Sequence, residues 1–228
     1  MSDFDQFSSD YDSTLAEGLS LTGEDKLYFA RGRLAWLAQV LAKFPIRTES
    51  LIDYGCGTGT SASLFFEQLG VEEIIGLDPS INSLEVARKT HDTARMKFYH
   101  LDEYQPCGQI DLTFCNGVFH HIPPKERADT ISYIYRCLRP GGFFAVWENN
   151  PWNPGTRFVM SRIPFDRDAV MLSHMEMGRI AKQCGFEVLR TDFLFIFPRA
   201  LRFLRWIEPS LSGLPLGGQY QVLCRKPE

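Results

Sequence analysis

The chain has 228 residues, of which 44% are hydrophobic, and it carries a formal net charge of −4. This length suits one large domain with a substantial core, so we expect a single domain over residues 1–228. The acidic balance and the lack of a long basic run argue against an extended nucleic-acid surface. Residues 1–12 are polar and acidic, unlike a secretory signal, and no apolar run approaches the roughly 20 residues of a membrane span.

The six cysteines are scattered along the chain and form no C-x-x-C pair. This distribution favours reduced, mostly buried thiols over a disulfide framework or a zinc site. We therefore expect a cytoplasmic protein without a metal centre.

Hydrophobic periodicity predicts alternating helices and strands. Apolar residues at steps of three and four predict an amphipathic helix over 24–44, which Pro45 ends. The next predicted elements are strand 50–54, helix 58–69, strand 74–77, helix 80–90, strand 96–101, strand 110–115, helix 124–138, a turn at 140–142 and strand 143–147. The last part is predicted as a long connection over 149–167, helix 168–184, strand 186–197, helix 199–208 and strand 218–225.

Alternation of this kind is typical of an α/β fold, in which a doubly wound, mostly parallel sheet carries helices on both faces. Ligands bind such sheets at the carboxyl ends of the strands. Four polar residues fall at or just after predicted strand ends, namely Asp53, Asp78, Asp102 and Asn116. They predict a ligand site along one edge of the sheet, with residues 1–30 and 149–175 as flaps over it.

The most informative segment is residues 53–59, which reads Asp-Tyr-Gly-Cys-Gly-Thr-Gly between a predicted strand and a predicted helix. Glycines permit a sharp turn and the close approach of a ligand. The helix that follows offers backbone N–H donors. The spacing differs from the G-x-G-x-x-G of a dinucleotide loop, and a carboxylate two residues before the first glycine suits an ammonium group better than a pyrophosphate.

This segment resembles motif I of the class I S-adenosylmethionine-dependent methyltransferases. Residues 111–123 resemble the motif IV of that family, and residues 138–142 resemble the turn before its fifth strand. The resemblance implies a seven-stranded Rossmann-like sheet whose last strand is antiparallel and lies between the fifth and sixth. It also implies S-adenosyl-L-methionine as cofactor and S-adenosyl-L-homocysteine as product. Within the domain we expect an N-terminal helical cap (1–48), a cofactor-binding core (49–148), a substrate flap and helix (149–185) and C-terminal strands (186–228).

The resemblance, carried over position by position, implies a set of cofactor-binding residues. Asp53 would meet the ammonium group, Asp78 the ribose hydroxyls and Asp102 the adenine amino group. The alternatives are a helix cap for Asp78 and a solvated loop acid for Asp102. The other implied positions are Tyr11, Arg31, Gly55, Cys56, Gly57, Pro79, Leu101, Asn116, Gly117 and Val118, with Arg33 as the alternative to Arg31 and surface salt bridges as the alternative role for both arginines.

Methyl transfer from a sulfonium depends mainly on holding the nucleophile in line with the methyl group. A base is needed only when the acceptor must lose a proton. His121 follows the fourth predicted strand and is the first candidate for this base, with a packing role as the alternative. His120 and then Glu148 are the next candidates.

The resemblance and the acidic composition together favour methylation of an oxygen or nitrogen on a small-molecule or sugar-like metabolite, without a nucleic-acid or membrane partner. An RNA or protein methyltransferase, a nicotinamide-dependent oxidoreductase and a binding module without activity are the alternatives. Arg157, Arg162 and Arg167 lie in the long connection and would meet either an acidic substrate group or solvent.

Overall fold

The computed structural model describes residues 22–163 and 169–228, so the predicted cofactor residue Tyr11 and the arginine at position 167 lie outside the described residues. The strands are β1 (Ser50–Tyr54), β2 (Glu73–Asp78), β3 (Met96–His100), β4 (Ile110–Asn116), β5 (Leu138–Asn149), β6 (Glu187–Leu194) and β7 (Gln219–Arg225). The helices are α2 (Lys26–Leu41), α3 (Ala62–Leu69), α4 (Ile81–His91), α5 (Arg127–Cys137), α6 (Pro154–Met160), α7 (His174–Gln183), the 3₁₀ helix η3 (Arg199–Ile207) and α8 (Glu208–Leu211).

The strands form one seven-stranded sheet in the order β3-β2-β1-β4-β5-β7-β6. Strands β1 to β5 pair in parallel, whereas β7 is antiparallel to both of its neighbours, β5 and β6. The predicted fold class is therefore confirmed, including the antiparallel last strand between the fifth and the sixth.

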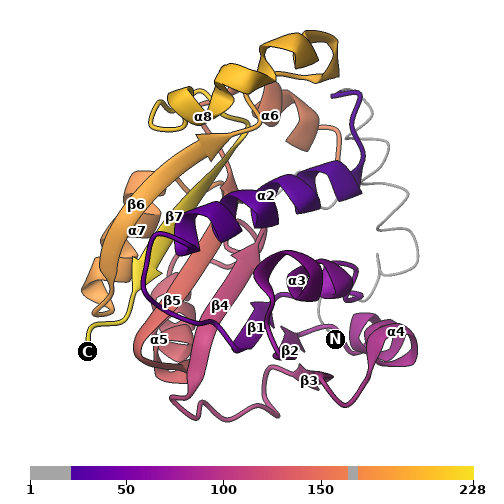
Figure 1. Ribbon diagram of the computed structural model, residues 1–228, viewed down its shortest axis with the longest axis vertical. Coiled ribbons are helices and arrows are strands. Elements are labelled where there is room, and N and C mark those ends of the chain that lie inside the picture. The colour runs from indigo at the N-terminus through magenta and orange to yellow at the C-terminus, as the bar shows by residue number, and fades with distance from the viewer. Residues whose placement is uncertain (1–21, 164–168) are drawn as a thin grey trace.

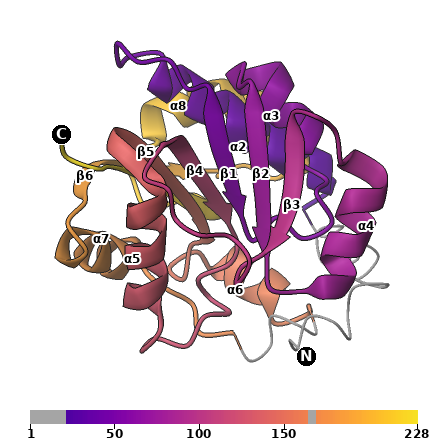
Figure 2. The same cartoon turned by 90° about the horizontal axis from the view of Figure 1, so that it is seen from below.

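Helices cover both faces of this sheet (Figure 1). On one face α2, α3 and α4 bury apolar residues such as Leu37, Phe65 and Leu84 against the strands. On the other face α5 and α7 contribute residues such as Ile131 and Met177. Seen from below, α2 and α3 lie on one side of the strands and α5 and α7 on the other (Figure 2). The central strands are buried on both sides, which explains the continuous apolar runs that predicted them.

Two segments differ from the prediction. The long connection contains helix α6, whose cap is the side chain of Asn153 accepting from Thr156 N at 3.0 Å, with Pro154 in the first turn. Residues 140–142, predicted as a turn before the strand, are included in β5, but the strand is irregular there. Its pairing with β4 passes from Leu138 opposite Ile110 to Phe143 opposite Leu112, and Gly141 has a φ of +74°. A Cβ at Gly142 would lie 2.9 Å from the carbonyl oxygen of Arg139, so the glycines permit this bulge.

One edge of the sheet gathers several strand ends. Because β7 runs antiparallel, its first residue Gln219 is paired with the last residues of both neighbours, Asn149 of β5 and Leu194 of β6. The carboxyl ends of β1, β2 and β4 lie at the same edge. Within the described parts of the chain, no helix has the length and apolarity needed to cross a membrane.

Candidate functional site

A cavity of about 890 Å³ opens at this edge of the sheet. Its walls come from the loops after β1, β2 and β4, from helices α2 and α6, and from the segment after β6. The cavity thus lies where parallel sheets of this kind bind ligands.

The glycine loop after β1 forms one wall. Gly55 has a φ of +76°, and a Cβ at this position would lie 2.3 Å from Cγ2 of Val118, so only glycine lets this loop pack against the loop after β4. Gly57 has a φ of +53°, and a Cβ there would meet nothing within 4 Å. The backbone at Gly57 therefore faces open space in which a ligand can approach closely.

Two buried carboxylates lie beside this loop. Asp78 accepts hydrogen bonds from Gly57 N at 2.8 Å and from Ser80 N at 2.9 Å, so it holds both the glycine loop and Ser80, the N-cap residue of helix α4. The side chain of Asp53 is buried one strand away. Burial, and then the charge of Asp78, raise the pKa of Asp53 to about 7, while the charge of Arg33 opposes this rise. A cationic ligand group would stabilise the ionised form of Asp53.

Of the two arginines weighed on helix α2, Arg33 is the one that lines the cavity. It is buried, and its Nη1 donates to Oε1 of Gln219 at 3.0 Å. Gln219 in turn donates to Oδ1 of Asn149 at 3.3 Å, which links α2 to the ends of β5 and β7. Arg31 is exposed and does not line the cavity, so the structure favours Arg33 at this site.

Most of the predicted cofactor residues line the cavity, namely Asp53, Gly55, Cys56, Gly57, Asp78, Pro79, Asn116, Gly117 and Val118. Leu101 and Asp102 do not line it. The turn after β3 carries Asp102 outward, where its side chain is 92% exposed and its amide donates to Nδ1 of His100 at 3.3 Å. The adenine role of Asp102 stays a prediction, and the cavity gives it no support.

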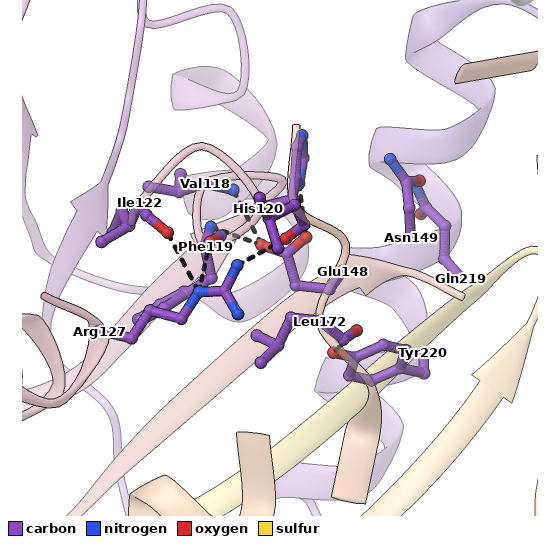
Figure 3. Close-up of polar contacts among 11 residues, drawn as sticks. Val118, Phe119, His120, Ile122, Arg127, Glu148, Asn149, Leu172, Gln219 and Tyr220 are labelled. Carbon is purple, nitrogen blue, oxygen red and sulfur yellow. Dashed lines mark hydrogen bonds and ion pairs between the residues drawn. The ribbon is translucent and has the colours of Figure 1, made fainter. Parts of the chain in front are cut away.

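The two predicted histidines, His120 and His121, line the cavity. The predicted acid, Glu148, lies beside His120 (Figure 3). Glu148 is fully buried, and its Oε1 accepts from the amides of Val118 and Phe119 at 3.0 and 2.6 Å. Its Oε2 lies 2.6 Å from Nδ1 of His120. The ring centroids of His120 and His121 are 4.0 Å apart. Glu148 is thus placed to orient His120 rather than to touch a ligand.

Arg127, which the sequence did not single out, supports the same loop. Its Nε donates to the carbonyl oxygens of Phe119 and Ile122, both at 3.1 Å (Figure 3). Its Nη1 donates to Glu176 of helix α7 at 3.0 Å. The guanidinium therefore ties the histidine-bearing loop to the helices beneath it.

Aromatic side chains line the far side of the cavity, a feature that the sequence did not predict. Phe195, just after β6, has a φ of +62°, the only positive φ of a non-glycine residue in the described ranges. Its ring packs edge-on against Phe29 and Tyr28 of α2, with centroids 4.9 and 6.0 Å apart. A Cβ at Gly32 would lie 2.7 Å from Cε1 of Phe195, so this helical glycine makes room for the ring.

Of the long-connection arginines, Arg157 is exposed and does not line the cavity. The guanidinium of Arg162 lies over the ring of Phe158, 4.6 Å from its centroid. Within residues 22–163 and 169–228, no group of three or more His, Cys, Asp or Glu side chains is arranged to hold a metal ion.

Comparison with known proteins agrees with this geometry. A family model described as "Methyltransferase domain" matches residues 51–142. A trans-aconitate 2-methyltransferase of Rhizobium leguminosarum bv. trifolii is 35% identical over 108 residues, which cover 47% of this chain and 41% of the relative. A trans-aconitate 2-methyltransferase of Shigella dysenteriae serotype 1 is 23% identical over 213 residues, which cover 87% and 84% of the two chains.

The crystal structure of an S-adenosylmethionine-dependent methyltransferase from Mesorhizobium loti superposes with a TM-score of 0.61 and 18% identity. The match covers 84% of this chain and 98% of that chain, and it supports the fold. The match to the Rhizobium relative spans only about two fifths of that relative's length. The family match over residues 51–142 contains the glycine loop and the strands β2, β3 and β4.

Proposed function

We propose that the chain, as a class I S-adenosylmethionine-dependent methyltransferase, transfers a methyl group to an oxygen or nitrogen of a small-molecule or sugar-like metabolite. One observation carries this proposal. A single cavity brings the loop at Gly55 and Gly57, with two buried acids, together with a histidine that is backed by a buried glutamate.

The residues around the loop fit the cofactor. Asp53 and Arg33 offer opposite charges for the ammonium and carboxylate of the methionine end. Asp78 is a carboxylate at the end of β2 that lines the cavity beside Gly57, and an ionised carboxylate only accepts hydrogen bonds, as the hydroxyls of a ribose require. The open space at Gly57 admits a ligand close to the backbone. When bound, S-adenosylmethionine supplies an electrophilic methyl, whose transfer breaks its S–C bond, forms an O–C or N–C bond and leaves neutral S-adenosylhomocysteine.

We assign the role of receiving the acceptor's proton to His120, ahead of His121, which the sequence ranked first. A carboxylate beside Nδ1 favours the tautomer that keeps a hydrogen on this nitrogen, so Nε2 is the basic one. The amides of Val118 and Phe119 donate to the same carboxylate, which fixes the position of the loop relative to the imidazole ring of His120. His121 lies against His120 and is the second candidate. In-line positioning by the cavity walls supplies the rest of the rate enhancement.

Thermal unfolding with S-adenosylhomocysteine, NADH or neither tests this function. At about 100 times its dissociation constant a ligand adds about 2.7 kcal/mol of stability, which for this chain length raises Tm by roughly 5–10 °C. We expect this rise with S-adenosylhomocysteine alone. No rise, or a rise with NADH alone, contradicts the proposal.

A matched pair of glycine variants links such binding to the loop. Gly57 and Gly70 both have positive φ, and a Cβ at either would meet nothing within 4 Å, but only Gly57 lines the cavity. Gly57→Ala and Gly70→Ala therefore introduce similar backbone strain. We expect only Gly57→Ala to weaken S-adenosylhomocysteine binding in calorimetry, and equal affinities in the two variants would remove the loop from the site.

A further inference from the structure

We propose that the acceptor is a planar, mostly apolar molecule with a reacting hydroxyl, of the hydroxyarene class, and that Phe195 is a residue that selects it. The inference rests on the proposed methyl transfer and names its substrate class. The proposed acceptor differs from trans-aconitate, the tricarboxylate in the names of the matched relatives.

The order of the strands divides the cavity into two halves. The glycine loop and the acids Asp53 and Asp78 lie at the ends of β1 and β2, toward one side of the sheet. Phe195 and Gln219 lie at the end of β6 and the start of β7, toward the other side. The loop after β4 with His120 lies between them. The reacting atoms therefore meet near His120, and the acceptor occupies the half over β5, β7 and β6.

The acceptor half is walled by aromatic side chains from three separate elements. Tyr28 and Phe29 come from α2, Phe158 from α6, and Phe195 and Phe197 from the segment after β6. The side chain of Phe158 lines the cavity and is still 51% exposed. Exposed apolar side chains that line a cavity usually mark a site where an apolar ligand binds. Aromatic walls favour flat rings, which stack on them or meet them edge-on.

The backbone at Phe195 is held in a conformation that phenylalanine rarely adopts. The φ of +62° places it in the left-handed region, and its carbonyl oxygen accepts from Gly218 N at 3.2 Å. Gly32, across the cavity wall on α2, leaves the space that the ring fills. Strained residues persist where the surrounding structure enforces them, and they gather at ligand sites. The strain at Phe195 thus points to a role in binding.

The charges of the cavity do not suit a trianion. Its described lining holds as many acidic as basic residues, namely Glu24, Asp53 and Asp78 against Lys26, Arg33 and Arg205. Arg205 already pairs with Glu24 at 2.9 Å and donates to the carbonyl oxygen of Phe197 at 3.1 Å. Its Nη2 is buried and has no hydrogen-bond partner within the described residues. The acidic and basic side chains of the lining therefore balance, which suits a mostly apolar ligand better than a trianion.

His120 also indicates an acceptor with a hydroxyl group. A carboxylate acceptor is already ionised at neutral pH and needs no base, whereas a hydroxyl must lose its proton during transfer. His120 with Glu148 behind it supplies that base. The step forms an O–CH₃ bond, breaks the S–CH₃ bond of the donor and passes the hydroxyl proton to Nε2 of His120.

The test compares two hydroxyarenes, 2-naphthol and 6-hydroxy-2-naphthoate, with trans-aconitate. Calorimetric titration into protein saturated with S-adenosylhomocysteine measures binding, and transfer of labelled methyl from S-adenosylmethionine measures turnover. We expect at least one hydroxyarene to bind and to be methylated, with kcat/KM at least about tenfold above that of trans-aconitate. Methylation of trans-aconitate alone, or binding of neither hydroxyarene, overturns the inference.

Three variants connect this result to Phe195. Phe195→Ala is expected to raise the KM for the hydroxyarene about tenfold or more and to leave S-adenosylhomocysteine affinity unchanged. Phe195→Leu, which keeps an apolar side chain, is the second variant in case the first misfolds. Phe203→Ala is the matched control, because Phe203 is 67% exposed and does not line the cavity. An unchanged KM in Phe195→Leu and Phe195→Ala overturns the role of Phe195.

The same experiment separates the two proposals. Failure of the wild-type protein to bind S-adenosylhomocysteine contradicts the methyltransferase function itself. Binding of S-adenosylhomocysteine with rejection of both hydroxyarenes leaves that function in place and contradicts only the acceptor class.

Discussion

The Oε2 atom of Glu148 lies 2.6 Å from Nδ1 of His120, and both side chains are buried. The other carboxylate oxygen accepts from two backbone amides of the same loop, those of Val118 and Phe119. One carboxylate therefore fixes both the histidine ring and the loop that carries it. This arrangement gives Glu148 a positioning role, although it does not touch the cavity.

The first prediction concerns this pair. Glu148→Gln replaces the carboxylate by an amide of the same size, which orients the imidazole less strongly and no longer balances its charge after proton transfer. We expect kcat to fall by about 10²-fold, the lower range for general-base catalysis, with little change in S-adenosylhomocysteine affinity. Steady-state kinetics and calorimetry measure the two effects. Glu126→Gln, a change at the exposed residue just before helix α5, is the control. Equal loss of affinity and turnover would mean that Glu148 serves only the fold.

The second prediction follows from the raised pKa of Asp53. With a pKa of about 7 in the free protein, about half of this carboxyl is protonated at neutral pH. A ligand with an ammonium group binds the ionised form, so binding releases a proton and affinity falls as the pH drops through 7. We expect S-adenosylhomocysteine to bind roughly tenfold more weakly at pH 6 than at pH 8.

Calorimetry in two buffers of different ionisation enthalpy measures both the affinity and the released proton. Asp53→Asn should bind more weakly and lose this pH dependence, because the amide cannot titrate. A pH profile that is the same in wild type and Asp53→Asn would show that another group is responsible.

The third prediction compares two acids that the sequence ranked together. Asp78 lines the cavity, and the side chain of Asp102 is 92% exposed outside it. We expect Asp78→Asn to weaken S-adenosylhomocysteine binding by about 1.5–3 kcal/mol, the range for a hydrogen bond to a charged group. Asp102→Asn should leave the dissociation constant unchanged. A comparable loss in Asp102→Asn would instead support the predicted adenine contact.

The fourth prediction concerns the glycine that faces Phe195. In Gly32→Ala the new Cβ would lie 2.7 Å from the ring, so the ring must move. We expect acceptor turnover to fall severalfold while S-adenosylhomocysteine binding is retained. Gly178→Ala is the control, because Gly178 also lies within a helix but has no atom closer than 4.0 Å to such a Cβ. It should raise stability by about 0.5–1 kcal/mol through helix propensity. A loss of turnover in both variants would remove the link to Phe195.

The sequence predicted the sheet and the glycine loop because both depend on local chemistry. Strand–helix alternation determines the sheet, and the spacing of Asp53, Gly55 and Gly57 is contained in a few neighbouring residues. Glu148 and His120 were each singled out, but their contact joins the end of β5 to the loop after β4 and depends on strand pairing. Only the structure could bring them together.

Two predicted residues lie away from the cavity for physical reasons. Arg31 and Arg33 are two positions apart on one helix, about 200° around its axis, so they point to opposite faces, and the sequence did not show which face meets the cavity. Asp102 follows β3 as expected, but the turn there directs it to solvent. Phe195 and Gly32 gave no local signal, because their contact joins segments far apart in the sequence.

The position of β7 has a consequence for the order in which the parts of the protein can fold during synthesis. Strand β6 is synthesised before β7, yet in the sheet it pairs only with β7. The strands β1 to β5 and the glycine loop can therefore assemble on the ribosome while β6 still lacks a neighbour and Gln219 has not emerged. Nascent chains halted before residue 219 should bind S-adenosylhomocysteine but should lack a complete acceptor half of the cavity. Their β5 edge, which β7 covers in the finished sheet, would remain unpaired and prone to aggregation.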